Sequence, residues 1–139
     1  MFLAGLLGVA GCGAERHDRP IDVTGSCYEF SGWDTVEVNE WALPALAMLS
    51  PRASVRDTAA FALIAESQTF SRRYMYWREV PPDSVEIVVS TGFSGAVLRL
   101  SVGADTLSGT VEEIYDAGDG ATGPAAAIRV PCGTRFEGR

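Results

Sequence analysis

Residues Ser84–Tyr115 read SVEIVVSTGFSGAVLRLSVGADTLSGTVEEIY, and this segment is the clearest guide to the fold class. Hydrophobic and polar residues alternate in Ser84–Ser90, in Ala96–Val102 and, with a break at Glu112–Glu113, in Thr106–Tyr115. Period-two alternation is typical of strands with one buried face. The segments between them are short and contain glycine, which turns readily at positive φ. The segment therefore predicts a three-stranded antiparallel meander with a β-bulge at the break.

Further strands are expected on both sides of this meander. On the C-terminal side we expect a long loop, Asp116–Pro124, and then a last strand, Ala125–Cys132, with Ile128 and Val130 on one face. On the N-terminal side the expected elements are a strand in Ser26–Gly32, one or two short strands in Val36–Leu49 interrupted by Pro44, and a strand at Tyr74–Trp77 that ends in the turn Pro81–Asp83.

Residues 50–66 fit two structures. Ser50-Pro51 could cap a helix, and the alanine-rich run AAFALIAE would be stable in one. The same run places Phe61, Leu63 and Ala65 on one face of a strand. The meander around it favours the strand, and the helix stays open as the alternative.

Composition excludes several classes of function. The chain has 139 residues, enough for one domain, with a net charge of −7. Such an acidic balance argues against nucleic-acid binding, which gathers positive charge. All basic residues are arginine, and the single histidine is His17. Without lysine or a histidine in the body of the chain, Schiff-base, P-loop and Ser-His-Asp chemistry are excluded, so we expect no enzyme and no cofactor.

Residues 1–11, MFLAGLLGVAG, are uncharged and too short to span a bilayer, which takes about 20 apolar residues. The run ends in Val9-Ala10-Gly11-Cys12, which resembles the lipobox of bacterial lipoproteins. The resemblance implies a signal peptide over 1–11, lipid on Cys12, a tether over 12–25 and a folded domain over 26–139. It also implies a lipid-anchored protein of the cell envelope, and Gly13 after the cysteine points to the outer membrane. The alternative is a buried N-terminal strand with a free cysteine.

Once Cys12 is assigned to lipid, Cys27 and Cys132 remain as a pair in an oxidising compartment, which favours a disulfide. The two residues lie at opposite ends of the folded region. A bridge requires their Cα atoms to lie within about 7 Å, so an up-and-down sheet must curl until its ends meet. We therefore expect an all-β fold, a small antiparallel up-and-down barrel of about seven or eight strands. A β-sandwich would also bring the termini together.

The half of the chain from Trp77 to Cys132 is similar to small bacterial envelope lipoproteins with a lipocalin-like (calycin-like) barrel. The resembling features are Cys27-Tyr28, Trp77, Asp83-Ser84-Val85, Gly92-Phe93-Ser94-Gly95, Asp105-Thr106-Leu107-Ser108-Gly109 and Arg129-Val130-Pro131-Cys132. The resemblance implies the barrel and the envelope address, and it implies no activity. The Gly-x-Trp signature of true lipocalins is absent, and Gly32-Trp33 is only a loose echo of it.

A basic and aromatic group offers a candidate binding site for a small apolar or amphipathic ligand inside the barrel. Its members are Trp33, Trp41, Phe61, Arg72, Arg73, Tyr74, Tyr76 and Trp77. The same residues could simply fill a small core, because a barrel of about eight strands has little interior space. The chain would then be a structural or interaction module, such as an accessory subunit of an envelope complex.

Acidic residues gather near the meander's end, at Glu112, Glu113, Asp116 and Asp119. Carboxylates beside a glycine turn could hold calcium, but their spacing does not match an EF-hand loop. Two cysteines without a histidine partner are likewise a poor metal site. We expect no bound metal.

Overall fold

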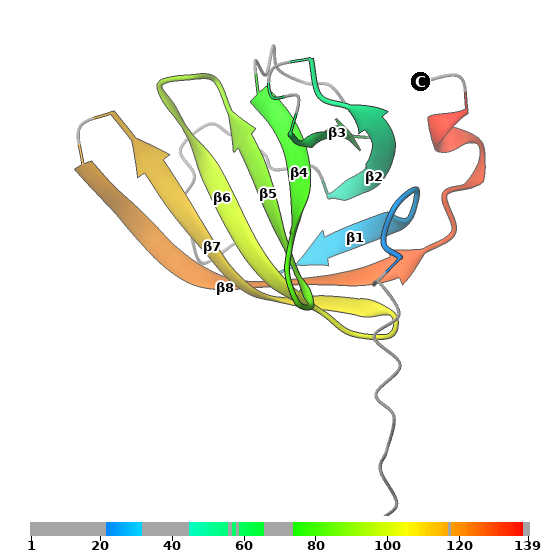
Figure 1. Cartoon of the computed structure of the whole chain (residues 1–139). Coiled ribbons are helices and arrows are strands. Elements are labelled where there is room, and N and C mark those ends of the chain that lie inside the picture. The colour runs from blue at the N-terminus through cyan, green and yellow to red at the C-terminus, as the bar shows by residue number, and fades with distance from the viewer. Residues whose placement is uncertain are drawn as a thin grey trace, which may run out of the picture.

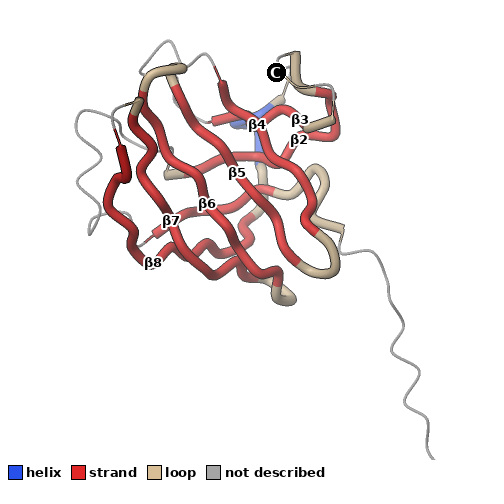
Figure 2. Tube along the Cα trace, turned by 60° about the vertical axis from the view of Figure 1, so that its left-hand side comes forward, coloured by secondary structure: helices blue, strands red, loops and turns tan. Residues whose placement is uncertain are grey.

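The computed structural model describes residues 22–31, 45–55, 57, 59–65, 74–116 and 118–137, with only the backbone of Asp119. Within these ranges eight strands form one closed antiparallel barrel, in which each strand pairs with the next in sequence and the last returns to the first (Figures 1 and 2). The strands are β1 (Cys27–Ser31), β2 (Leu46–Ala53), β3 (Phe61–Ala65), β4 (Tyr74–Val80), β5 (Ser84–Ser90), β6 (Ser94–Val102), β7 (Thr106–Tyr115) and β8 (Gly118–Val130). The predicted all-β, up-and-down barrel is confirmed.

Pairing between β1 and β8 closes the barrel. The register runs from Cys27 opposite Val130 to Ser31 opposite Ala126. Cys132 lies two residues beyond the end of β8 and forms a disulfide with Cys27, with 5.2 Å between the Cα atoms. The predicted bridge between the first and last strands is confirmed, and the sandwich alternative is wrong.

Side chains point alternately into and out of the barrel along each strand, and the inward-pointing ones fill its interior. Val85, Ile87 and Val89 of β5 point inward, as their spacing predicted, and Leu98 and Leu100 of β6 lie opposite them. Further core residues come from the other strands and from the segment before β1; they are Val23, Tyr28, Phe30, Ala47, Leu49, Leu63, Trp77, Ala96, Leu107, Val111, Ala125 and Ala127. All are buried, so the barrel encloses a continuous hydrophobic core.

The glycine-rich segment 116–124 is the main error of the sequence prediction. From Gly118 onward it is strand and pairs with β7, instead of forming a long loop. The register between the two strands shifts between Glu112 and Ile114, which confirms the predicted bulge. Gly120 lies opposite this bulge, where a Cβ atom would overlap the backbone of Glu113. The glycine therefore permits close approach of two strands, a role that a sequence cannot distinguish from a turn.

The described part of residues 50–66 contains the end of β2, a connection and β3, and it contains no helix, so the helical alternative is wrong. Pro51 lies inside β2, at an irregularity where the register with β3 shifts between Leu49 and Ala53. Proline lacks the N–H that a regular ladder uses, and such irregular positions tolerate it. The motif that resembles a helix start is therefore a bulged strand.

A second, smaller cluster lies outside the barrel wall. The 3₁₀ turn η2 (Gly133–Phe136) follows the disulfide and lies beside β1 and β2 (Figure 1). Phe136 packs there against Cys27 and Leu46, and all three are buried. Ile128, on the outer face of β8, remains 60% exposed. The C-terminal turn thus covers the disulfide and one end of the closing seam.

Removing the disulfide tests how far closure depends on it. In a Cys12→Ala background, the double variant Cys27→Ala/Cys132→Ala should unfold with a free energy lower by about 4–5 kcal/mol, since the bridge spans 105 positions of the unfolded chain. Urea denaturation monitored by tryptophan fluorescence measures the difference, with Cys12→Ala alone as the control. A loss below about 1 kcal/mol would contradict a stabilising role for the bridge.

Candidate functional site

The structure divides the residues predicted to bind a ligand. Trp33, Trp41, Arg72 and Arg73 lie outside the described residues, as does the lipidation residue Cys12. The remaining four are on neighbouring strands: Phe61 begins β3, and Tyr74, Tyr76 and Trp77 belong to β4. Phe61 and Trp77 are paired across β3 and β4, so the structure brings these two together.

Trp77 is part of the barrel core. Its side chain is 0% exposed, and its ring stacks on Phe61 at a centroid distance of 5.0 Å. The indole Nε1 donates a hydrogen bond of 3.0 Å to the carbonyl oxygen of Ser50, within the irregular part of β2. Trp77 thus satisfies a buried backbone acceptor and fills space, which is the structural role that tryptophan commonly has in cores.

Tyr74 and Tyr76 alternate with Trp77 along β4 and therefore face outward. Tyr76 lies opposite Val88 of β5, which is outside the inner core, and Tyr74 lies against Gly92 in the β5–β6 turn. The sheet consequently separates residues that are adjacent in sequence. Within the described part of the chain, the aromatic group does not line a common cavity.

Packed side chains occupy the barrel interior. The largest fully buried ones are Trp77, Tyr28, Leu49, Ile87, Leu98, Leu100 and Leu107. Three pockets formed by described residues lie at one end of the barrel or on its outer surface. The described side chains thus fill the part of the barrel interior that they line.

One end of the barrel, here called the mouth, carries the β4–β5 and β6–β7 turns and is covered by the segment Asp22–Ser26. Val23 of this segment is 1% exposed and joins the core. The N–H of Gly25 donates to the carbonyl oxygen of Leu49 at 2.6 Å. Arg129 donates from Nη2 to the carbonyl oxygen of Asp22 at 3.1 Å. The folded part of the chain therefore includes residues 22–25, which the sequence predicts to belong to the tether.

Arg129 also stabilises the closing seam at the mouth. It lies opposite Tyr28 in the β1–β8 pairing and donates to the Tyr28 hydroxyl, with 3.2 Å from Nη2. This hydrogen bond, together with the nearby carboxylates of Asp105 and Asp22, raises the pKa of the guanidinium above its ordinary value. One arginine therefore ties the segment before β1 to the last strand.

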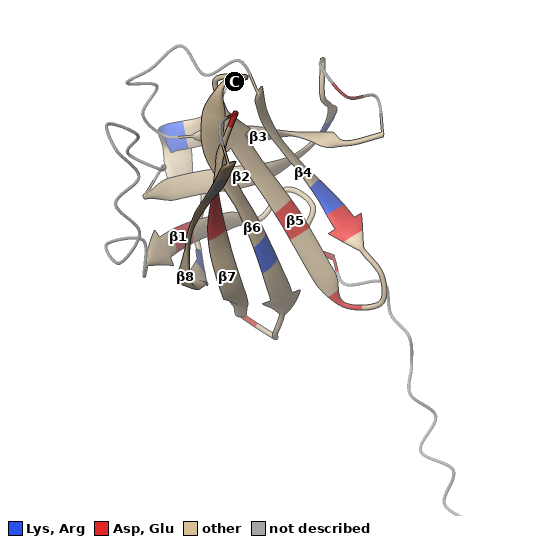
Figure 3. Cartoon of the chain, turned by 90° about the vertical axis from the view of Figure 1, so that its left-hand side faces the viewer, with Lys and Arg blue, Asp and Glu red and all other residues tan. Residues whose placement is uncertain are grey.

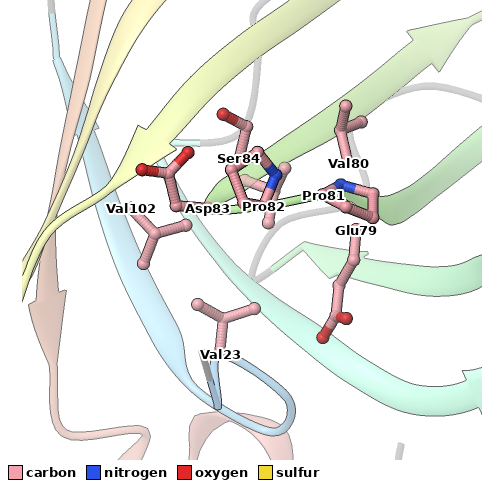
Figure 4. A pocket seen from close by; sticks show the side chains of 9 residues that line it. Val23, Glu79, Val80, Pro81, Pro82, Asp83, Ser84 and Val102 are labelled. Carbon is pink, nitrogen blue, oxygen red and sulfur yellow. The ribbon is translucent and has the colours of Figure 1, made fainter. Parts of the chain in front are cut away.

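A pocket of about 140 Å³ opens at the mouth, between the covering segment and the β4–β5 turn; we call it the mouth pocket (Figure 4). Its lining combines valines and prolines with two carboxylates; the residues are Val23, Glu79, Val80, Pro81, Pro82, Asp83, Ser84, Val85 and Val102. The sequence showed the Pro81–Asp83 turn but gave no sign of the pocket. A lone valine in a polar stretch has no periodicity that would reveal its burial.

The other two pockets lie on the outer surface. One, of about 640 Å³, lies between η2 and the wall, where Glu29, Leu46, Val130 and Arg135 contribute to its lining. The other, of about 340 Å³, runs beside Glu86 and Arg99 on β5 and β6.

An ion-pair row crosses the outer face of β4 to β7. Arg78 pairs with Glu86, and Arg99 bridges Glu86 at 3.4 Å and Glu112 at 2.8 Å (Figure 3). The hydrogen bond to Glu112 is the main cause of the raised pKa of Arg99. The two arginines and Glu112 are well exposed to water, although Glu86 is only 12% exposed, so each pair contributes about 0–1 kcal/mol to stability. The row balances its own charge and keeps this face polar.

Glu112 and Glu113 lie on opposite sides of the wall. Glu113 points inward near the end opposite the mouth and is 5% exposed. Its carboxylate accepts hydrogen bonds from the Tyr115 hydroxyl at 3.1 Å and from the N–H of Ala121 at 3.2 Å. Partial desolvation of the phenol and then this bond to Glu113 raise the pKa of Tyr115. Among the described side chains, no three potential ligands gather in a metal site.

Comparisons with protein families, with curated proteins and with solved structures found no match for this chain. No helix in the described part of the chain is long and apolar enough to cross a membrane.

Substitution on β4 separates the inner from the outer aromatic residues. Trp77→Phe should lower the free energy of unfolding by about 1–3 kcal/mol, because it leaves the buried carbonyl of Ser50 without its donor. Tyr76→Phe, the matched control on the outer face, should stay within about 0.5 kcal/mol of the parent. Denaturant unfolding followed by circular dichroism measures both. Equal effects of the two substitutions would contradict the assignment of Trp77 to the core.

Proposed function

We propose that the chain is a membrane-anchored envelope lipoprotein whose barrel acts through its outer surface, as a structural or interaction module. The observation that carries the proposal is the filled interior: Trp77, Tyr28 and the aliphatic residues around them occupy the space that a ligand would need. Small-molecule pockets usually measure about 300–1,000 Å³, and the two described pockets of that size, of about 640 and 340 Å³, lie on the outer surface and not inside the barrel. This favours the interaction module over the ligand carrier, between which the sequence did not decide.

Energetics support this choice. Opening an apolar cavity inside a packed core costs about 24 cal/mol per Å³, so a cavity of about 300 Å³ would cost about 7 kcal/mol. That cost approaches the whole stability of a typical domain, about 5–15 kcal/mol. The free energy of ligand binding would have to exceed this cavity cost for the open, ligand-bound barrel to be the more stable state.

The anchor part of the proposal rests on Val9-Ala10-Gly11-Cys12 at the end of an apolar run. Two or three acyl chains on a cysteine hold a protein firmly, because each buried methylene contributes about 0.8 kcal/mol. From Cys12 to Asp22 the chain can extend over at most about 35 Å. Since Asp22 is held at the mouth by Arg129, the anchor keeps the mouth within about 35 Å of the bilayer.

The proposal assigns no catalysis to the chain. Lysine is absent and the single histidine is His17, so mechanisms that need a lysine nucleophile or a histidine base in the barrel lack their residues. Glu113, the one buried carboxylate of the described core, accepts two hydrogen bonds that hold the β7–β8 bulge. These hydrogen bonds give the buried Glu113 carboxylate a structural role.

Native mass spectrometry of the full chain, extracted from envelope membranes in non-ionic detergent, tests the proposal. We expect a processed chain that begins at Cys12 and carries two or three acyl groups, in complex with a stoichiometric protein partner and without an apolar ligand inside the barrel. The matched Cys12→Ala variant should carry no acyl groups and should leave the membrane fraction. A stoichiometric apolar ligand on the extracted chain would contradict the filled-module function, and an acylated Cys12→Ala variant would contradict the anchor.

A further inference from the structure

The mouth pocket combines an apolar floor with charged walls. Val23 and Val85 are almost fully buried and, with the partly buried Val102, form the floor. Figure 4 shows Val23 pointing toward the Pro81–Ser84 turn; the Asp83 carboxylate lies at one end of this turn and the Glu79 carboxylate at the other, and the two point in different directions. The N–H of Val102 donates to the carbonyl oxygen of Asp83 at 2.8 Å, which fixes the turn against β6. The pocket is therefore held by the closed barrel and by the segment that covers its end.

Both carboxylates lack a cationic partner within the described residues. Neither the Glu79 nor the Asp83 side chain has a hydrogen bond or ion pair there. The nearest arginine in sequence, Arg78, pairs with Glu86 on the outer face, and Arg129 is bound to Tyr28 and Asp22. The arginines nearest to the pocket are thus engaged elsewhere, and the Glu79 and Asp83 carboxylates remain available.

From this combination we infer that the mouth pocket is a binding site for a small alkylammonium group. The alkyl part would lie against the three valines, and the ammonium would lie at the rim, where the carboxylates of Glu79 and Asp83 supply negative charge. A volume of about 140 Å³ corresponds to about five waters at the density of the liquid, which suits an amine of two to four carbons. A larger drug-sized molecule would not fit.

The charge of the pocket and the composition of the chain favour an alkylammonium over an anionic or a neutral ligand of the same size. The two carboxylates and the net charge of −7 disfavour an anion, and a neutral alkyl group would leave the carboxylates unused. The chain contains no lysine, so it has no side-chain ammonium of its own to occupy the pocket. The group must come from another molecule.

Two sources carry this chemistry: free alkylamines and the ethanolamine headgroup of a phospholipid. If the anchor of the proposed function holds, the mouth lies within about 35 Å of the bilayer, which places lipid headgroups within reach. Binding of a free amine does not depend on the anchor, so failure of the lipid anchor and failure of the site are distinguishable.

The test is a titration of the isotope-labelled full chain, in amine-free non-ionic detergent, with n-butylammonium. We expect saturable NMR shifts of the Val23, Ser84 and Val102 amides at millimolar concentration, and none with butanol or butyrate. Glu79→Gln and Asp83→Asn should each weaken binding about two- to fivefold, and added salt should weaken binding of the parent chain. Glu137→Gln, which removes the same charge at the exposed C-terminal turn, should leave the affinity unchanged.

The outcomes separate clearly. No saturable shift with butylammonium, equal shifts with butanol, or an unchanged affinity in both Glu79→Gln and Asp83→Asn would overturn the site. If butylammonium binds, phosphatidylethanolamine vesicles identify the source. Shifts of the same amides with these vesicles, absent with phosphatidylglycerol vesicles, assign the site to a lipid headgroup. Shifts with the free amine alone assign it to a soluble amine.

Discussion

The hydrogen-bonded pairing of β1 with β8 is the constraint on which the rest of this structure depends. Five residue pairs, from Cys27 with Val130 to Ser31 with Ala126, convert an open meander into a barrel. Closure removes the exposed edges that an open sheet would present to other chains. It also brings Val23, Tyr28 and Arg129 to one end, where they cover the core. The disulfide acts on the same seam, because it joins the segments at its end.

A closed barrel of eight short strands leaves its interior to side chains, and here these side chains complete the packing. Trp77 from β4 and Tyr28 from β1 reach into the core, and each uses its polar atom: Trp77 donates to Ser50, and Tyr28 accepts from Arg129. Fully satisfied polar groups of this kind specify one arrangement of the core, because any other would leave them unpaired. Function is therefore to be sought on the outer surface and at the ends.

Much of this fold could be predicted from the sequence, and the failures have physical causes. Alternation in β5, β6 and β7 identified both the strands and their inner faces, because one face of each is buried and the other is solvated. The spacing of the cysteines predicted closure. The strand at Gly120 was predicted to be a loop, because the sequence does not distinguish a glycine required by close strand approach from one required by a turn. Ser50-Pro51 also fitted the start of a helix, because proline is tolerated both at a helix start and at a strand irregularity such as this one.

The candidate site was harder to predict than the fold. Tyr76 and Trp77 are neighbours in sequence, and the strand period alone was enough to place them on opposite faces, yet their shared aromatic character suggested one group. The mouth pocket depends on Val23 and Val102, which are distant in sequence and meet only after the barrel closes. No local pattern encodes such a meeting.

A filled barrel is the central claim, and xenon binding tests it most directly, because xenon enters empty apolar cavities without needing a polar partner. In NMR spectra under xenon pressure, the methyl groups of Ile87, Leu98 and Leu107 should show no saturable shift. A Leu98→Ala variant should bind xenon at the space it opens, which shows that the measurement can detect a cavity. Saturable xenon binding by the parent barrel at these methyl groups would contradict a filled interior.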